Sequence, residues 1–370
     1  MRALVTGGAG FIGSHIVDRL LADGFRVRVL DSLDPRVHPN GQPAYLPSTV
    51  DFVHGDIADR ETMRHVLRDI DVVFHQAAYQ DYMPDFSRFI HVNAEGTALL
   101  YETIVRDRLP VKKIVVASSQ AVYGEGQYVC AVHGFLSVQP RSAAQLAKGQ
   151  WEVLCPICSK DAKACLLTEE VTNPYNQYAV SKLAEEKTAL GLGWMYDIPT
   201  VALRYSITQG PRQSLYNHYS GICRIFFSRA MLGQSLLIYE DGDQTRDFVH
   251  IEDVVDANML ALETSNADFQ AFNVGSGQKK SVLDYASAVL EKLGSSSGLD
   301  IRGEYRRGDN RHSVSSVNKL TRLGWRPRRS FSSILDDFLA WIESIGGIPR
   351  SIPDAYSEMR SAGVVLAASE

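Results

Sequence analysis

Tyr178 and Lys182 are the two residues of this chain whose types and spacing most directly suggest catalysis. On a helix they would stand on one face, about one turn apart. An ammonium beside a phenol favours the phenolate, so a tyrosine in this setting can act as a general base. The pair therefore predicts removal of a proton from an alcohol. A surface pair on an amphipathic helix would show the same pattern, so the rest of the chain must decide.

A glycine-rich segment near the N-terminus has the context of a dinucleotide site. Residues 2–6 have the pattern of a buried strand, GGAGFIG follows at 7–13, and 14–22 have helical periodicity. Glycines let the backbone turn tightly and approach a diphosphate, and the helix aims N–H groups at it. A second strand ends at Asp31, whose carboxylate would bind the adenosine ribose and repel a 2′-phosphate. We therefore predict NAD rather than NADP.

The alternation of strands and helices continues beyond this unit. Repeated βα units predict an α/β fold with a doubly wound parallel sheet (Rossmann). Ligands bind at the carboxyl ends of such strands, where Asp56, Ala77 and Ser119 are expected to lie. The expected strands are 50–53, 72–74, 113–117 and 200–205, and the expected helices are 61–68, 94–107, 222–232 and 332–342.

Together these features resemble the extended short-chain dehydrogenases, in their nucleotide-sugar epimerase and dehydratase branch, over residues 1 to about 340. The matching segments are VTGGAGFIG at 5–13, Asp31, GDI at 55–57, HQAA at 75–78, SSQAVYG at 118–124 and YAVSK at 178–182. The resemblance implies that Ser119, Tyr178 and Lys182 are catalytic. It implies a cofactor site for NAD made of Gly7, Gly10, Phe11, Ile12, Gly13, Asp31, Asp56, Ile57, Ala77, Asn93, Tyr178 and Lys182.

The same resemblance implies a nucleotide-diphosphate sugar, a UDP- or dTDP-hexose, as the substrate. Guanidinium groups suit a diphosphate, although Arg246 could instead pair with its neighbour Asp247. Ser206 and Ile207 replace the Phe-Asn that this family usually has, which removes a common diphosphate contact. The substrate-binding residues implied are Gln80, Ser119, Tyr205, Arg246, Arg306 and Asp309.

The reaction implied by the resemblance is epimerisation, most often at C4, through a transient ketone. The family's 4,6-dehydratases place Asp-Glu after the catalytic Ser or Thr, and its decarboxylases usually place Glu at the second position. This chain has Gln120 and Ala121 there. We therefore expect an epimerase, with a dehydratase, decarboxylase or ketoreductase using the same Ser-Tyr-Lys triad as alternatives. Non-catalytic relatives generally lose the Tyr or the Lys.

A segment at about 126–172 is longer than the family's compact members need. It contains Cys130 and His133, and then Cys155 and Cys158, each pair with the spacing of a zinc knuckle. The two pairs can close a tetrahedral structural zinc site in a loop with little apolar content of its own. Free thiols in a surface loop are the alternative, and Cys165 allows a different ligand set.

Composition places few further limits on function. The chain has 370 residues and a net charge of −5. Its content of 45% hydrophobic and 22% charged residues is typical of globular proteins. The chain has no excess of basic residues that would indicate a nucleic-acid partner. Strand-like sequence starts within two residues and no apolar run reaches the roughly 18 residues of a membrane span. The expected location is therefore cytoplasmic, and five cysteines argue against a disulfide framework.

We expect three parts in the chain. Residues 1–205 should form the NAD-binding domain, with the Cys/His insert inside it. Residues 206–345 should mainly bind the nucleotide sugar, and the tail at 346–370 has no predicted function. The family resemblance also implies a homodimer built from the helix after Asn93 and the helix of Tyr178. Leu99, Leu100, Thr103 and Ile104 could face either a partner or the sheet.

Overall fold

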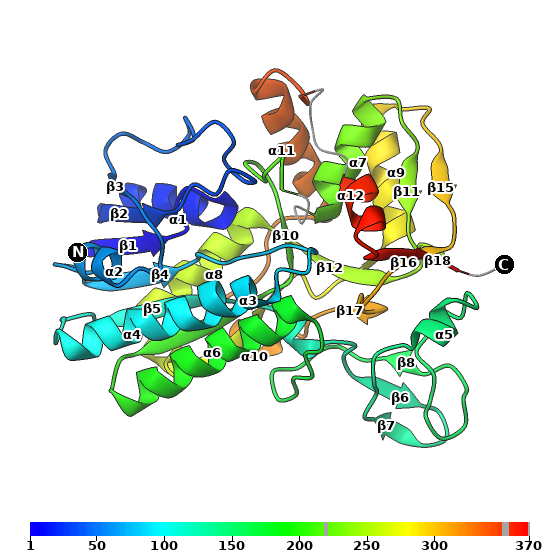
Figure 1. Ribbon diagram of the computed structural model, residues 1–370, viewed down its shortest axis with the longest axis horizontal. Coiled ribbons are helices and arrows are strands. Elements are labelled where there is room, and N and C mark those ends of the chain that lie inside the picture. Colours follow the sequence, from blue (N-terminus) through cyan, green and yellow to red (C-terminus); the bar gives the residue numbers. More distant parts are fainter. Residues whose placement is uncertain (218–220, 350–354, 369–370) are drawn as a thin grey trace.

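A computed structural model describes residues 1–217, 221–349 and 355–368. Its largest sheet has seven strands in the order β13-β9-β5-β4-β1-β2-β3 (Figure 1). All neighbours in it are parallel, which confirms the predicted Rossmann sheet. The strands are β1 Arg2–Thr6, β2 Arg26–Asp31, β3 Asp51–His54, β4 Val72–His75, β5 Lys113–Ser119, β9 Thr200–Tyr205 and β13 Gln270–Val274.

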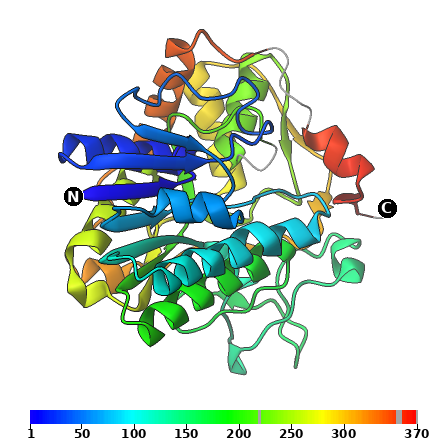
Figure 2. The same ribbon diagram turned by 60° about the vertical axis from the view of Figure 1, so that its left-hand side comes forward.

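Helices cover both faces of this sheet (Figure 2). One face packs against α1 (Phe11–Ala22) and α8 (Ile251–Glu263), and the other against α2 (Arg60–Val66), α4 (Gly96–Arg106) and α6 (Gln177–Met195). Side chains of β1 alternate between these two cores, because successive strand residues point to opposite faces. The sheet is therefore buried on both sides.

One detail differs from the sequence-based expectation, and the structure answers one question that the sequence left open. The helix expected at 94–107 is preceded by α3 (Phe86–Phe89) and a π-helical turn (Ile90–Glu95), which run without a break into α4. The residues considered for a dimer contact, Leu99, Leu100, Thr103 and Ile104, are all buried within the chain. Leu99, Leu100 and Ile104 pack toward the sheet, so these four residues do not form an exposed dimer face.

A second lobe stands at the carboxyl edge of the sheet (Figure 1). Its apolar core lies among three helices, α7 (Gly221–Met231), α9 (Val282–Leu293) and α11 (Phe331–Ser344). Cys223 is fully buried on α7, as expected of a core residue. Ser281 and Asp284 form the predicted capping box at the start of α9. The short strands of this lobe are β10 Ile207–Gln209, β11 Leu236–Ile238, β12 Thr245–His250, β14 Lys279–Ser281, β15 Leu299–Ile301 and β17 His312–Ser313.

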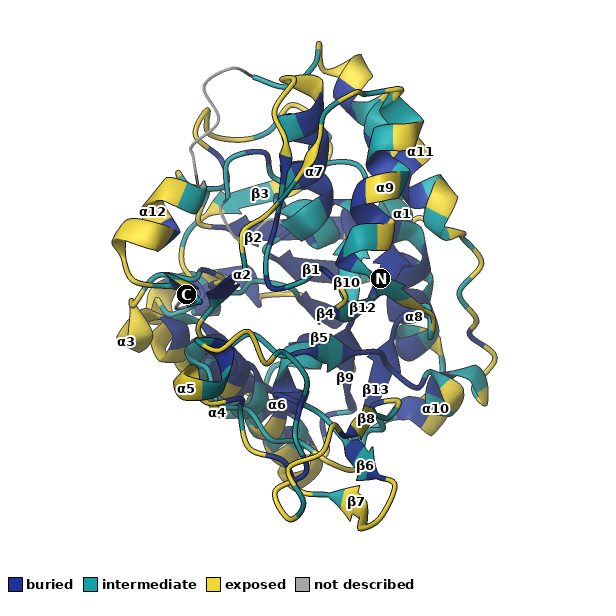
Figure 3. Cartoon of the chain, turned by 90° about the vertical axis from the view of Figure 1, so that its right-hand side faces the viewer, coloured by how far each residue is buried: buried dark blue, intermediate teal, exposed yellow. Residues whose placement is uncertain are grey.

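The insert forms a small subdomain with a three-stranded sheet, β7-β6-β8. Contrary to the expectation of little apolar content, it has a small core of its own, formed by Tyr128, Val138, Val153 and Ala162. Its outer loops are exposed, whereas most strands of the large sheet are buried (Figure 3). Its elements are β6 Tyr128–Cys130, β7 Gly134–Leu136, α5 Ala143–Leu146 and β8 Lys163–Ala164.

The tail has structure that the sequence did not predict. Helix α12 (Ala355–Ser361) is followed by β18 (Val365–Ala367), which pairs antiparallel with β16 (Glu304–Arg306). Among the residues described, no helix is long and apolar enough to cross a membrane. The remaining short helices are Gln120–Tyr123, Ser265–Ala267 and α10 Asn318–Thr321.

Candidate active site

The glycine loop between β1 and α1 has a backbone shape that side chains would block. Gly7 has φ of +66°, and a Cβ there would lie 2.7 Å from the nitrogen of Ala77. A Cβ on Gly13 would lie 2.2 Å from the carbonyl oxygen of Gly7. No side chain caps the start of α1, so its N-terminal N–H groups face the loop. These features fit a dinucleotide diphosphate held by backbone groups.

Asp31 closes the same end of the sheet. Its two carboxylate oxygens accept hydrogen bonds from the N–H groups of Ala9 at 3.0 Å and Leu33 at 2.9 Å. These contacts fix the carboxylate at the end of β2, beside the glycine loop. The position fits an acceptor for ribose hydroxyl groups.

One pocket of about 510 Å³ extends from this loop to the second lobe. It lies at the carboxyl edge of the parallel strands, where ligands of such sheets bind. Among the described residues, its lining includes almost every site residue predicted from sequence: Gly7, Gly10, Phe11, Ile12, Gly13, Asp31, Asp56, Ile57, Ala77, Gln80, Ser119, Tyr178, Lys182, Tyr205, Arg246, Arg306 and Asp309.

Tyr178 and Lys182 lie in the first turns of α6. The side chain of Asn176 accepts a hydrogen bond from the nitrogen of Ala179 at 2.8 Å and so starts the helix just before the tyrosine. Both side chains line the pocket and are almost fully buried. Gln80 donates from Nε2 to the Tyr178 hydroxyl at 2.6 Å. This hydrogen bond holds the phenol oxygen in position within the pocket.

The ammonium of Lys182 lies beside a carboxylate that sequence analysis missed. Lys182 Nζ donates to Oε2 of Glu185 at 2.5 Å, one turn along the same helix. Burial raises the pKa of Glu185 to about 7, against the opposing effect of Lys182. Burial also lowers the pKa of His75 to about 3, so this histidine is neutral between Thr6 and Thr97. The spacing of Lys182 and Glu185 on a helix was the available signal.

The two adjacent serines at the end of β5 have different partners. Ser118 donates to Oε2 of Glu186 at 2.7 Å, and the same glutamate holds Arg204 through a pair of short hydrogen bonds. Ser119 lines the pocket, and its oxygen accepts from the nitrogen of Ala121 at 3.1 Å. Its hydroxyl proton can therefore be donated into the pocket. This difference agrees with the assignment of Ser119 from the sequence.

Two predicted site residues make their polar contacts with the protein. Asn93 is absent from the described pocket lining, because its amide binds the backbone of Tyr79 and the hydroxyl of Ser181. It supports the pocket wall from behind. Tyr205 lines the pocket, but its hydroxyl lies 3.1 Å from Gln76 Oε1 and 3.0 Å from Asn258 Oδ1.

The arginines at the far end of the pocket lie in the second lobe. Arg246 donates to the carbonyl oxygens of Thr245, Asn310 and Arg311. The alternative ion pair with Asp247 is not formed; that carboxylate accepts from Ser206, Ser276, Gly277 and Ser315. Arg246 therefore holds the backbone just after Asp309, where the chain enters β17.

Arg306 lies between two aromatic rings. Its guanidinium carbon is 4.5 Å from the ring centre of Tyr82 and 5.2 Å from that of Tyr239. Its Nη2 is 2.6 Å from a carboxylate oxygen of Asp309. The tail contributes Val364 to the same wall. Neither ring nor the tail was predicted, because all three come from segments distant in the sequence.

A Rossmann sheet with a glycine loop, an acidic residue at the end of β2 and a buried Tyr-Lys pair on a helix defines a dinucleotide-dependent enzyme of the short-chain dehydrogenase type. Residues 3–275 match the NAD dependent epimerase/dehydratase family. The chain belongs to this family.

Named relatives agree with this membership. The chain is 34% identical to a dTDP-L-rhamnose 4-epimerase of Burkholderia thailandensis, over 92% of this chain and 94% of the relative. The structure of a Thermus thermophilus UDP-glucose 4-epimerase in complex with NAD is 30% identical, with a TM-score of 0.73, covering 93% and 99% of the two chains. A Thermotoga maritima UDP-glucose 4-epimerase solved with UDP-glucose is 28% identical, with a TM-score of 0.75 and the same coverage.

Proposed function

We propose that this protein is an NAD-dependent 4-epimerase of a nucleotide-activated hexose, with a UDP- or dTDP-sugar as substrate. The observation that carries the proposal is one continuous pocket that contains the glycine loop, the Tyr178–Lys182 pair and the arginines of the second lobe. The family and the named 4-epimerases among its relatives support it.

The chain's residues have separate tasks in this reaction. Bound NAD supplies a reversible hydride acceptor. Tyr178 removes the proton of the sugar hydroxyl, and Gln80 positions its oxygen through a hydrogen bond. Ser119 donates a hydrogen bond to the reacting oxygen. The buried position of all three catalytic side chains, Ser119, Tyr178 and Lys182, keeps water away from the ketone.

The cofactor and the nucleotide sugar are assigned to two parts of the chain. Residues 1–205, with α8 and β13 added by the structure, hold the cofactor through Gly7 to Gly13, Asp31, Asp56 and Ile57. Within 206–345, Arg306 and Asp309 bind the diphosphate and the nucleotide ribose, and Arg246 fixes the strand end beside them. Tyr82 and Tyr239 form apolar walls around Arg306.

Elimination of water is disfavoured by the residues after Ser119. Gln120 accepts a hydrogen bond from Ser313 at 3.1 Å. Ala121 packs against the apolar cluster of Tyr79, Phe89 and Tyr178. Neither position offers a carboxyl group for the extra acid or base of a dehydratase. The epimerase is therefore favoured over the dehydratase and the decarboxylase.

A homodimer is part of the proposal, and since the α4 residues considered from sequence are buried, we place its face on the segment before α4 and on α6. Phe86 on α3, Ile90 on the π-helical turn and Val180 on α6 expose 61%, 45% and 42% of their surface, and these three elements are neighbours. Light scattering on the purified protein should give twice the chain mass. A monomer at micromolar concentration would contradict this assembly.

The enzymatic proposal is tested with a panel of UDP-, dTDP-, GDP- and CDP-sugars. One UDP- or dTDP-hexose should give a product of unchanged mass that separates from the substrate, without added NADH. Tyr178→Phe should lose turnover by at least about a hundredfold, since the general base is absent, while NAD stays bound. Turnover equal to wild type in this variant would contradict the role of Tyr178.

A further inference from the structure

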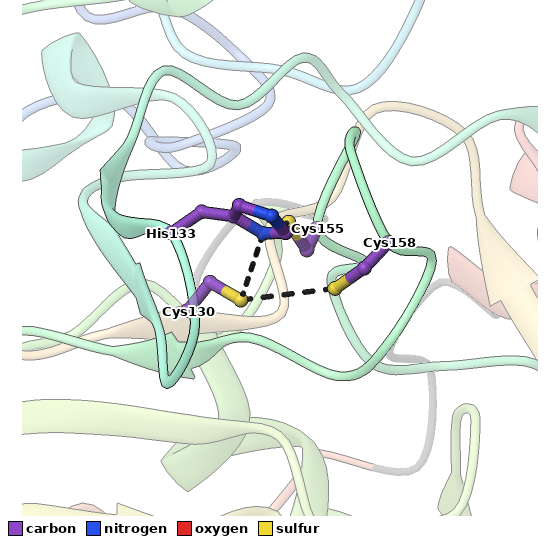
Figure 4. A group of neighbouring side chains, drawn as sticks. All are labelled: Cys130, His133, Cys155 and Cys158. Carbon is purple, nitrogen blue, oxygen red and sulfur yellow. Dashed lines mark hydrogen bonds between the residues drawn. The ribbon is translucent and has the colours of Figure 1, made fainter.

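The insert contains a cluster of metal-ligating side chains that the epimerase reaction does not use. Cys130 and His133 lie at the turn between β6 and β7, and Cys155 and Cys158 lie on a second turn of the insert. Figure 4 shows the four side chains pointing toward one another. Their ligand atoms all lie within 4.8 Å of each other.

Three of the distances between these atoms fit the edges of a zinc tetrahedron. Zn–S bonds of about 2.3 Å and Zn–N bonds of about 2.0 Å place ligand atoms roughly 3.5 to 3.8 Å apart. The Cys130 and Cys158 sulfurs are 3.8 Å apart. Nδ1 of His133 is 3.5 Å from the Cys130 sulfur and 3.4 Å from the Cys155 sulfur. The sulfurs are too far apart for a disulfide, and all five cysteines are free.

Three sulfurs and one imidazole nitrogen make a closed ligand set. Such a set leaves no position for a substrate or a reactive water, which is typical of structural zinc. The backbone N–H of Val132 also points at the Cys130 sulfur, at 3.4 Å. A donor at this sulfur stabilises a thiolate that binds metal.

The segment between the two ligand pairs contacts a loop that lines the substrate pocket. Arg141 donates to the carbonyl oxygen of Asp309 at 2.9 Å and to Glu240 at 3.0 Å. Glu152 binds Arg311 at 2.7 Å and His312 at 3.1 Å. Arg141 and Arg311 are almost fully buried. The insert is therefore one wall behind the loop that carries Asp309.

We propose that Cys130, His133, Cys155 and Cys158 bind one structural zinc ion, which closes the segment 134–154 and fixes Arg141 and Glu152 behind the Arg306–His312 loop. Closing both ends of this segment with a metal removes much of its conformational freedom. The part of the proposal that concerns substrate affinity rests on the proposed function of this pocket.

Metal analysis of the purified chain tests the site directly. Wild type and Cys165→Ser, a control outside the cluster, should contain about one zinc per chain, and Cys155→Ser and Cys158→Ser less than about 0.2. If the variants do not fold, wild type grown with cobalt should show the intense visible absorption of tetrahedral cobalt with thiolate ligands. Wild type without zinc and without this absorption, or with a Cys130–Cys158 disulfide, would overturn the site.

Two further measurements test the link to the pocket. Chelator-treated wild type should be cut within 134–154 by a protease faster than untreated protein, and added zinc should restore protection. Its dissociation constant for UDP or dTDP should rise about tenfold, with bound NAD unchanged. Glu152→Gln should weaken nucleotide binding while keeping zinc. Equal cleavage with and without zinc would overturn the proposal that zinc closes the segment 134–154. Failure of wild type to bind either nucleotide would contradict only the proposed function.

Discussion

Lys182 Nζ lies 2.5 Å from Oε2 of Glu185, and both side chains are buried beside the cofactor end of the pocket. The other oxygen of Glu185 has no hydrogen-bond partner among the described residues. Burial accordingly raises the pKa of Glu185 to about 7, from an ordinary value of 4.5. The charge of Lys182 is thus balanced by a carboxyl group that titrates near neutral pH.

This pair predicts a pH-dependent stability. A raised pKa in the folded state means that the contribution of Glu185 is fully present below pH 4.5 and is lost as pH rises through 7. Glu185→Gln lacks this loss, so its free energy of unfolding relative to wild type should increase between these pH values. Urea unfolding at both ends of the range measures it. Glu61→Gln, at a side chain that is 79% exposed, should show no such trend; equal trends in both variants would contradict the prediction.

Gln80 is predicted to support Tyr178 through its amide donor at 2.6 Å. Hydrogen bonds to charged groups contribute about 1.5 kcal/mol or more, so Gln80→Ala should lower kcat about tenfold. Gln80→Glu, which has the same shape without the donor, should be at least as slow at neutral pH. A wild-type kcat in both variants would exclude this role.

The preference for NAD is predicted to depend on the carboxylate of Asp31. Asp31→Asn keeps the shape but removes the charge that repels a 2′-phosphate, so the affinity for NADP relative to NAD should rise about tenfold. Titration of both dinucleotides into protein stripped of cofactor measures the ratio. An unchanged ratio would show that another group sets the preference.

The glycine loop gives a sharp steric prediction. Gly13→Ala places a Cβ 2.2 Å from the carbonyl oxygen of Gly7, so the loop must shift and bound NAD should be lost. Gly191→Ala, at an exposed position of α6, places a Cβ with nothing within 4 Å and is the matched control. It should retain NAD and gain up to about 1 kcal/mol of stability from helix propensity. Full NAD content in Gly13→Ala would contradict the assignment of the loop.

Motifs within one stretch of sequence indicated residues that the structure brings together in one pocket. The glycine loop, Asp31, Ser119 and the Tyr178–Lys182 pair all line the pocket as expected, because each sits where a strand or helix starts or ends. The parallel sheet with helices on both faces followed from the alternation of strands and helices along the sequence.

The substrate half depends on contacts between distant segments, which local patterns do not encode. Strand β13 joins the sheet beside β9, and β18 of the tail pairs with β16 next to Arg306. The ring of Tyr82 meets Arg306 from a loop far away in the sequence. Asn93 was expected at the cofactor, yet its amide binds the backbone of Tyr79. Such partners become visible only in the folded chain.

The most direct test of the proposed chemistry follows the hydrogen on the inverted carbon. The purified protein is given the active nucleotide sugar with deuterium at C4, in ordinary water and without added cofactor. Transient oxidation by bound NAD predicts an epimer that keeps its deuterium, because the hydride leaves and returns within the closed pocket. An epimer that has exchanged this deuterium for solvent hydrogen would contradict the account.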